Sequence, residues 1–311
     1  MHAFMTQYPQ HLSYNRLPLL ADSVFDYTYT DLDSPQHTYP MKPAVSPGDV
    51  FFVKTDILDN EIVKSFLNKL DVPVILVTGV SDMTPTEDQF EWITSNPNIR
   101  RWIGTNILQS HPKVVKVPIG VSEPGKPNSI HHELVRLHAE RIPWDRKFNG
   151  FCVPHHAKSH SDDGGPIPLV NANNPLRLVR ANTQTRPRMS FYDYMKTISS
   201  YRFVVCMPGF GVDCHRTCET LLMGSVPVLL RTGLDDMYSQ FPCLLVDSFE
   251  NIDTSAFVWD EAKYQHFLDV FWLRPAFWQP IIDESERLKQ RGLVNVKCPD
   301  NVTFAWTSTS R

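Results

Sequence analysis

The chain has 311 residues, which suggests two domains, and its 42% hydrophobic and 21% charged residues are typical of a globular protein. Thirty Lys and Arg residues against 34 Asp and Glu residues give a formal net charge of −4, which argues against nucleic acid as a partner. No apolar run approaches the roughly 20 residues of a membrane helix, and residues 1–15 lack a secretory leader pattern. The six cysteines form no CxxC pair, and Cys206, Cys214 and Cys218 lie in apolar or helical patterns that predict buried thiols. We expect no metal site and a cytoplasmic protein.

Short apolar runs alternate with amphipathic stretches from Gly48 onward. Residues 1–47 are polar and punctuated by proline, and we expect them to be irregular. The pattern then predicts strands at 49–53, 72–78, 99–103 and 114–119, with helices near 60–70 and 90–93. Continuous apolar strands separated by helices indicate a parallel sheet that is covered on both faces.

The alternation pauses over residues 122–147 and then begins again. The pause contains prolines and a His-, Glu- and Arg-rich helical stretch, which we interpret as a domain connection. The second half predicts strands at 148–153, 176–179, 201–207, 226–230 and 244–246, helices at 191–200 and 214–224, and an aromatic-rich helical region at 255–292. Two successive α/β halves bind ligands at the C-terminal ends of their strands, in the crevice between the halves.

Residues 201–229 carry the strongest functional signal. A strand runs into a glycine-containing turn, and a helix is predicted to begin near Asp213, a good N-cap residue. The free N–H groups and positive dipole end of a helix N-terminus suit a phosphate or diphosphate. On this helix Arg216 and Glu219 share one face, which would present a cation to a diphosphate and a carboxylate to the two hydroxyls of a ribose. An exposed i,i+3 ion pair is the alternative.

This segment resembles the exostosin-like glycosyltransferases, in which a strand and a Pro-Gly turn precede Asp-x-x-Arg-x-x-Glu and a Gly-Ser-x-Pro-Val ending. The matching residues are Asp213, Arg216, Glu219, Gly224, Pro227 and Val228. The first half is similar to a small branch of that superfamily, seen in large algal viruses and in the xylosyl-transferring dystroglycan enzymes. Its landmarks correspond to Val53–Asp56, Ser81–Asp82, Trp102–Asn106 and Pro118–Gly120. In the turn Met207–Phe210 the chain lacks the basic residue that relatives often carry between Pro and Gly.

The resemblance implies an α/β fold of the GT-B type, with two Rossmann-like domains and a donor/acceptor cleft between them. We expect an acceptor-binding domain at 1–145, a nucleotide-sugar-binding domain at 146–285, and a C-terminal tail at 286–311 that could return to the first domain. The donor-binding residues would be Arg216, Glu219, Asp213, Gly209, Gly211, His155 and Lys158.

The resemblance also implies an inverting glycosyltransferase of glycan biosynthesis. It would move a sugar from a UDP-sugar to a hydroxyl of an acceptor oligosaccharide, with UDP-xylose as the donor that the small branch indicates. The family needs no essential metal, so we expect no cofactor besides the UDP-sugar co-substrate. If the protein is viral, it would act in the host cytoplasm.

Inverting transfer needs a base that takes the proton of the acceptor hydroxyl, and two carboxylates of the first half follow predicted strands. Asp82 comes after a Gly-Val-Ser turn with no Lys or Arg nearby in the sequence, so it is the favoured base. Asp56 lies two residues after Lys54, an ion-pair partner that would keep its pKa low, so it ranks second and would position the acceptor. For either carboxylate the alternative is a helix N-cap.

Two further readings stay open. Asp31 and Asp33 form the DxD motif of metal-dependent GT-A transferases, but they follow no apolar strand and favour a surface turn. The His and Asp residues at 155–163 fit no zinc-site spacing and favour a polar loop, with donor contacts from His155 and Lys158. A non-catalytic module that binds a glycan or nucleotide is the alternative function.

Overall fold

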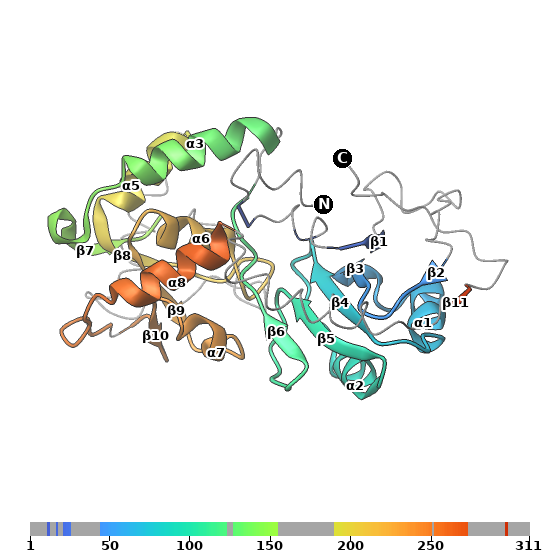
Figure 1. Cartoon of the computed structure of the whole chain (residues 1–311). Helices are drawn as coiled ribbons and strands as arrows, with labels where there is room; N and C mark the ends of the chain where they lie inside the picture. Colours follow the sequence, from blue (N-terminus) through green and yellow to red (C-terminus); the bar gives the residue numbers. More distant parts are fainter. Residues whose placement is uncertain are drawn as a thin grey trace. The chain divides into compact units, whose positions relative to one another are not determined.

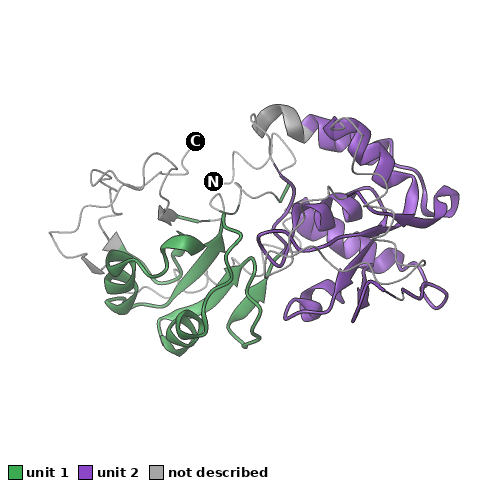
Figure 2. Ribbon diagram, turned by 180° about the vertical axis from the view of Figure 1, so that it is seen from behind, with its two compact units in different colours: residues 1–117, 273–311 green, residues 118–272 purple. Residues whose placement is uncertain are grey.

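The computed structural model describes residues 11–12, 17, 21–25, 44–122, 127–154, 190–250, 252–272 and 296–297. The chain divides into two compact units, unit 1 with residues 1–117 and 273–311 and unit 2 with residues 118–272 (Figure 2). Each unit is built on its own parallel sheet, so the predicted α/β class with two successive sheet-based units is confirmed (Figure 1). None of the helices in the described ranges has the length and apolar character that spanning a bilayer requires.

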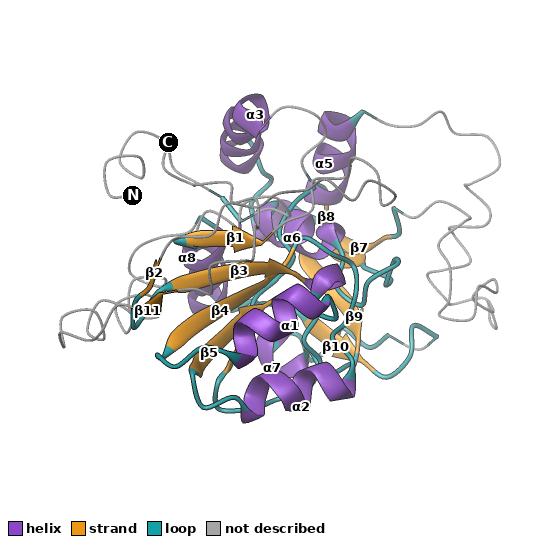
Figure 3. Ribbon diagram, turned by 90° about the vertical axis from the view of Figure 1, so that its right-hand side faces the viewer, coloured by secondary structure: helices purple, strands orange, loops and turns teal. Residues whose placement is uncertain are grey.

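Unit 1 contains a five-stranded parallel sheet in the order β1-β3-β4-β5-β6. The strands are β1 (Ser23–Phe25), β3 (Val50–Lys54), β4 (Val74–Gly79), β5 (Ile99–Gly104) and β6 (Val114–Lys116). β3 and β4 are buried along their whole length, which is why their sequences are continuous apolar runs. Helices α1 (Glu61–Asn68) and α2 (Glu87–Ser95) pack on the face of the sheet that carries Phe51, Val53 and Leu76 (Figure 3).

The expectation that residues 1–47 are irregular is wrong at two short strands. β1 pairs in parallel with β3, and β2 (Ala44–Val45) pairs antiparallel with β11 (Val296–Lys297). Asp22 holds the start of β1, because its N–H donates to the carbonyl of Val50 at 2.8 Å and its Oδ2 accepts from the N–H of Val50 at 2.9 Å. Strands of two or three residues are too short to show a hydrophobic period, so the sequence did not indicate them.

Unit 2 contains a four-stranded parallel sheet in the order β10-β9-β8-β7. Its strands are β7 (Phe148–Cys152), β8 (Tyr201–Val205), β9 (Val226–Leu230) and β10 (Leu244–Val246). Its helices are α3 (Pro127–Ala139), α5 (Phe191–Ser199), α6 (His215–Leu222), α7 (Asp235–Tyr238) and α8 (Glu261–Phe271). The strand predicted at 176–179 lies outside the described residues. Strand order follows chain order in both sheets, so in the described part neither sheet has the reversal of order that marks a ligand site by topology.

The units divide between residues 117 and 118, earlier than the predicted boundary at 145/146. The stretch interpreted as a domain connection belongs largely to unit 2, because it packs there. Nδ1 of His138, in α3, lies 2.9 Å from the carbonyl oxygen of Leu222 in α6. Lys147, at the end of this stretch, donates to carbonyl groups at the ends of two unit 2 helices. Residues 273–311 are grouped with unit 1.

Candidate functional site

Helix α6 begins at His215, and Cys214 rather than Asp213 is its N-cap. Asp213 is buried, and both of its carboxylate oxygens accept hydrogen bonds from within unit 2. Oδ2 accepts from the N–H of Ile119 at 2.8 Å, and Oδ1 accepts from the hydroxyl of Tyr238 in α7. Burial raises the pKa of Asp213, and these two hydrogen bonds oppose the rise. The N-cap expectation is therefore wrong, and Asp213 joins three segments of unit 2.

The segment 118–122, where unit 2 begins, lies against the first turns of α6. Nδ1 of His215 lies 3.0 Å from the carbonyl oxygen of Gly120. A carbonyl oxygen can only accept, so Nδ1 carries the proton in this contact. The backbone N–H of Ser122 donates to the carboxylate of Glu219. Residues of the Asp-x-x-Arg-x-x-Glu segment thus bind the first residues of unit 2 by hydrogen bonds. These first residues include Pro118–Gly120, one of the landmarks of the family resemblance.

Glu219 is buried in α6, with 6% of its surface exposed. Its Oε2 accepts a hydrogen bond from the hydroxyl of Tyr194 in α5 at 2.8 Å. Burial raises the pKa of Glu219, and Tyr194, His215 and Arg216 oppose that rise. An exposed i,i+3 ion pair is therefore excluded for this carboxylate. The expectation that one face of α6 stays open is also wrong, because the buried residues surround the helix: Thr217, Cys218, Glu219, Thr220, Leu221 and Leu222.

Arg216 lies beside the carboxyl ends of β7 and β8. Burial raises the pKa of Cys152, the last residue of β7, to about 12, and the charge of Arg216 opposes this rise. Burial likewise raises the pKa of Cys206, which follows β8, and Arg216 again opposes it. Both thiols therefore stay protonated at neutral pH, as expected of buried cysteines. Arg216 itself places a positive charge at the sheet edge where open α/β proteins bind their ligands.

The turn between β8 and α6 leaves its backbone accessible at Gly209. A Cβ atom built at this glycine would have no neighbour within 4 Å, and Gly209 does not adopt a positive φ. Its N–H donates to the carbonyl of buried Gly211 at 3.2 Å, and Phe210 between them is 94% exposed. Packing within the described residues does not require glycine here, and the space is compatible with a ligand approaching the backbone. His155, Lys158, Asp31 and Asp33 lie outside the described residues.

Asp56 and Asp82 lie at the carboxyl ends of the neighbouring strands β3 and β4 of unit 1. Asp56 makes the predicted ion pair with buried Lys54, at 2.8 Å between Nζ and Oδ2. Its Oδ1 accepts a hydrogen bond from Ser81 at 2.8 Å. Asp82 follows Ser81 and is exposed. The structure therefore brings both candidate bases to one edge of the unit 1 sheet, where both are exposed and Asp56 is held by Lys54 and Ser81.

The N-cap alternative is excluded for both carboxylates. α1 is capped by Asn60 and α2 by Thr86. Two residues before Asp82, Val80 has a φ of 54°, in the left-handed region that β-branched residues rarely adopt. Backbone outliers of this kind cost on the order of 1–3 kcal/mol and cluster at functional sites. The strained turn is a second feature that marks this edge of unit 1.

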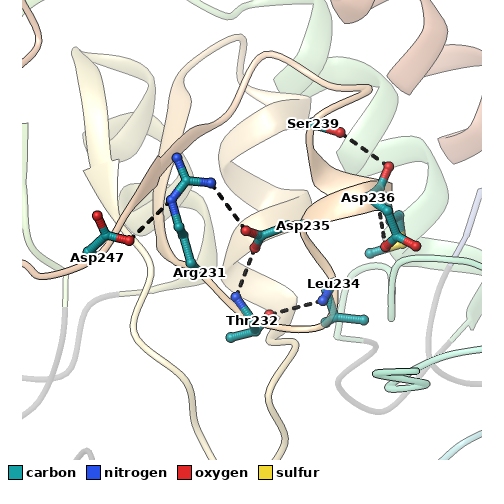
Figure 4. A network of polar contacts seen from close by, with 8 residues as sticks. Arg231, Thr232, Leu234, Asp235, Asp236, Ser239 and Asp247 are labelled. Carbon is teal, nitrogen blue, oxygen red and sulfur yellow. Dashed lines mark hydrogen bonds and ion pairs between the residues drawn. The ribbon is translucent and has the colours of Figure 1, made fainter. Parts of the chain in front are cut away.

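A separate polar network lies beyond β9 and β10 in unit 2 (Figure 4). Arg231 contacts Asp235 of α7 at 3.3 Å and Asp247 at 3.2 Å. Oδ1 of Asp235 also accepts from the N–H of Thr232 at 2.8 Å. The side chain of Asp247 is 92% exposed and that of Arg231 is 53% exposed, so each pair contributes little to stability. The network ties the loop before α7 to the end of β10.

No protein-family model matches the chain, and no curated protein matches its sequence. Among solved structures, one match is described as "Trehalose-6-phosphate from E. coli bound with UDP-2-fluoro glucose". The similarity has a TM-score of 0.30 and 11% sequence identity, over 81% of this chain and 75% of that chain. A similarity at this level carries no information about the site or its chemistry.

Two features of the site were not found from the sequence. Tyr194 lies 25 residues before Glu219, and their contact depends on how α5 packs on α6. The attachment of the segment 118–122 to α6 was also missed. For that segment a signal existed, because Pro118–Gly120 was a landmark of the family resemblance without an assigned role.

Proposed function

We propose that the chain is a glycosyltransferase of the GT-B type that takes its sugar from a UDP-linked donor. Unit 2 binds the nucleotide sugar, and unit 1 binds the acceptor oligosaccharide. The observation that carries the proposal is the position of Arg216 and buried Glu219 in the first turns of α6, beside the carboxyl ends of β7 and β8. A guanidinium and free helix N–H groups suit a diphosphate, and a carboxylate can accept the hydroxyls of a ribose. The resemblance of this segment to exostosin-like enzymes supports the same assignment.

The proposed reaction is a direct displacement at the anomeric carbon. The acceptor oxygen forms a bond to the anomeric carbon while the bond between the anomeric carbon and the diphosphate oxygen breaks. The configuration at that carbon therefore inverts. Asp82 takes the proton of the acceptor hydroxyl, and the electron pair of the broken bond leaves with UDP. Asp56, held by Lys54 and Ser81, positions the acceptor. Arg216 stabilises the leaving diphosphate. The family resemblance is the basis for proposing that the transfer needs no metal and that the sugar is xylose.

The donor site is tested by calorimetric titration with UDP. Arg216→Ala and Glu219→Gln should each lower the affinity roughly 10- to 100-fold, because each loses a hydrogen bond to a charged group. Arg231→Ala is the matched control, since it removes an exposed guanidinium from the β9 side of the same sheet edge, and it should leave the affinity unchanged. If neither site variant weakens UDP binding, the donor site is misplaced. A thermal-shift panel of nucleotide sugars identifies the donor, and a preference for a GDP- or ADP-sugar would reject the family placement.

The alternative functions predict different results in a turnover assay. A non-catalytic module would bind UDP without hydrolysing a UDP-sugar or transferring its sugar. A metal-dependent GT-A type of transferase would lose turnover when EDTA is added, whereas the proposed enzyme would retain it.

A further inference from the structure

The carboxylate that the proposed function assigns to the ribose is held by a tyrosine with no assigned role. Tyr194 lies in α5, which packs on α6, and its hydroxyl donates to Oε2 of Glu219 at 2.8 Å. Burial and the charge of Glu219 raise the pKa of Tyr194 well above its usual value. The phenol is therefore protonated, and its single proton lies in this hydrogen bond.

Several groups determine the charge of Glu219. Burial favours the neutral acid. Four groups favour the charged carboxylate instead. They are the hydroxyl of Tyr194 from α5, His215 and Arg216 from α6 itself, and the N–H of Ser122 from the segment 118–122. Among these groups the hydrogen bond from Tyr194 opposes burial most strongly. Loss of that hydroxyl removes both a charge-stabilising contact and the group that fixes the position of Oε2.

We propose that Tyr194 is a positioning residue that holds the Glu219 carboxylate as an acceptor for the ribose hydroxyls, and so makes the site selective for ribonucleotide diphosphates. This inference rests on the proposed function of Glu219. An ionised carboxylate can only accept hydrogen bonds, and both ribose hydroxyls can donate to it. A protonated or displaced carboxyl group would lose at least one of these contacts, so discrimination between ribose and dideoxyribose would fall.

The test compares Tyr194→Phe with Tyr192→Phe. Tyr192 lies in the same helix, and its hydroxyl donates to Glu140 at 3.0 Å in an exposed position, so its loss is a matched control. UDP and 2′,3′-dideoxy-UDP are titrated calorimetrically into each variant between about pH 5 and pH 8. In Tyr194→Phe we expect UDP affinity at neutral pH to fall on the order of 10-fold, the size of effect typical of a weakened hydrogen bond to a charged group, because Oε2 is no longer fixed in position, while dideoxy-UDP affinity stays unchanged. The pH below which UDP affinity is lost should rise, and Tyr192→Phe should match the wild type in both respects.

The outcomes separate this inference from the proposed function. If the wild type prefers UDP to dideoxy-UDP and Tyr194→Phe keeps that preference and its pH profile, the role of Tyr194 is rejected alone. If the wild type shows no such preference, the proposed role of Glu219 is rejected. If Tyr194→Phe does not fold, Glu219→Gln provides the second test, because its amide does not ionise and the pH dependence of the preference should disappear. Persistence of that dependence in Glu219→Gln would overturn the inference.

Discussion

Replacement of Lys147 by methionine should remove a large pH dependence from the stability of unit 2. Lys147 is 4% exposed, and its Nζ donates to the carbonyl oxygens of Ser199 at 2.6 Å and Met223 at 2.9 Å, where α5 and α6 end. The negative ends of the two helix dipoles favour a cation at this position. Burial has the larger effect, and together with nearby Arg141 it lowers the pKa of Lys147 to about 7.

The magnitude follows from the difference between this pKa and the ordinary lysine value of 10.5. Between about pH 7 and pH 10.5 the unfolded chain keeps a proton that native Lys147 loses, so the free energy of unfolding rises with pH in this window. At 1.36 kcal/mol per unit, the full difference corresponds to roughly 5 kcal/mol, and the part between pH 7 and pH 9.5 to roughly 3 kcal/mol. Below pH 7 the lysine is charged in both states, and the whole cost of burying the charge remains.

Urea unfolding of the wild type and of Lys147→Met at several pH values between about 7 and 9.5 measures this effect. The free energy of unfolding of the wild type should rise relative to that of the variant by roughly 3 kcal/mol over the range. Lys263→Met is the matched control, because exposed Lys263 also donates to a carbonyl, that of Ser239 at 2.8 Å, and its pH curve should parallel the wild type. Parallel curves for the wild type and Lys147→Met would refute the lowered pKa.

Two further substitutions test the structural role of buried Asp213 and the catalytic role of exposed Asp82. Asp213→Asn should lower the free energy of unfolding by roughly 1–3 kcal/mol, because the N–H of Ile119 and the hydroxyl of Tyr238 would no longer both have a charged acceptor; a change below about 0.5 kcal/mol in urea unfolding would contradict this. Asp82→Asn should lower turnover on the order of 10²–10⁴-fold while UDP binding persists. Near-normal turnover would reject Asp82 as the base, and a collapse in Asp56→Asn alone would transfer the role to Asp56.

The sequence predicted the most deeply buried strands best. β4 and β9 are largely apolar because they are buried within their sheets, and the alternation of apolar runs with amphipathic stretches indicated their positions. The short strands β1, β2 and β11 depend on partners far along the chain, such as the pairing of Ser23 with Phe51, and carry no local pattern. Local sequence pattern therefore indicates the buried strands of each sheet, whereas the short strands form only through tertiary contacts.

The sequence indicated one contact of the candidate residues but not what covers helix α6. The ion pair between Lys54 and Asp56 was predicted because the two residues are close in the sequence, and it is confirmed at 2.8 Å. The open face of α6 was predicted wrongly because helical periodicity treats a helix in isolation. That face is covered by α5 and by the segment 118–122, and no pattern within α6 could indicate either.

The contacts of Glu219 also explain why a carboxylate suits this position. An ionised carboxylate has about four acceptor sites and no donor. The hydroxyl of Tyr194 and the N–H of Ser122 use two of them within the protein, which leaves about two, the number that a ribose with two hydroxyls needs. Glutamine at this position would offer a single acceptor oxygen, and its NH₂ group could accept neither from the N–H of Ser122 nor from a donating ribose hydroxyl. The hydrogen bond from Ser122 and the proposed binding of the ribose both require a side chain that accepts several hydrogen bonds and donates none. A carboxylate meets this requirement.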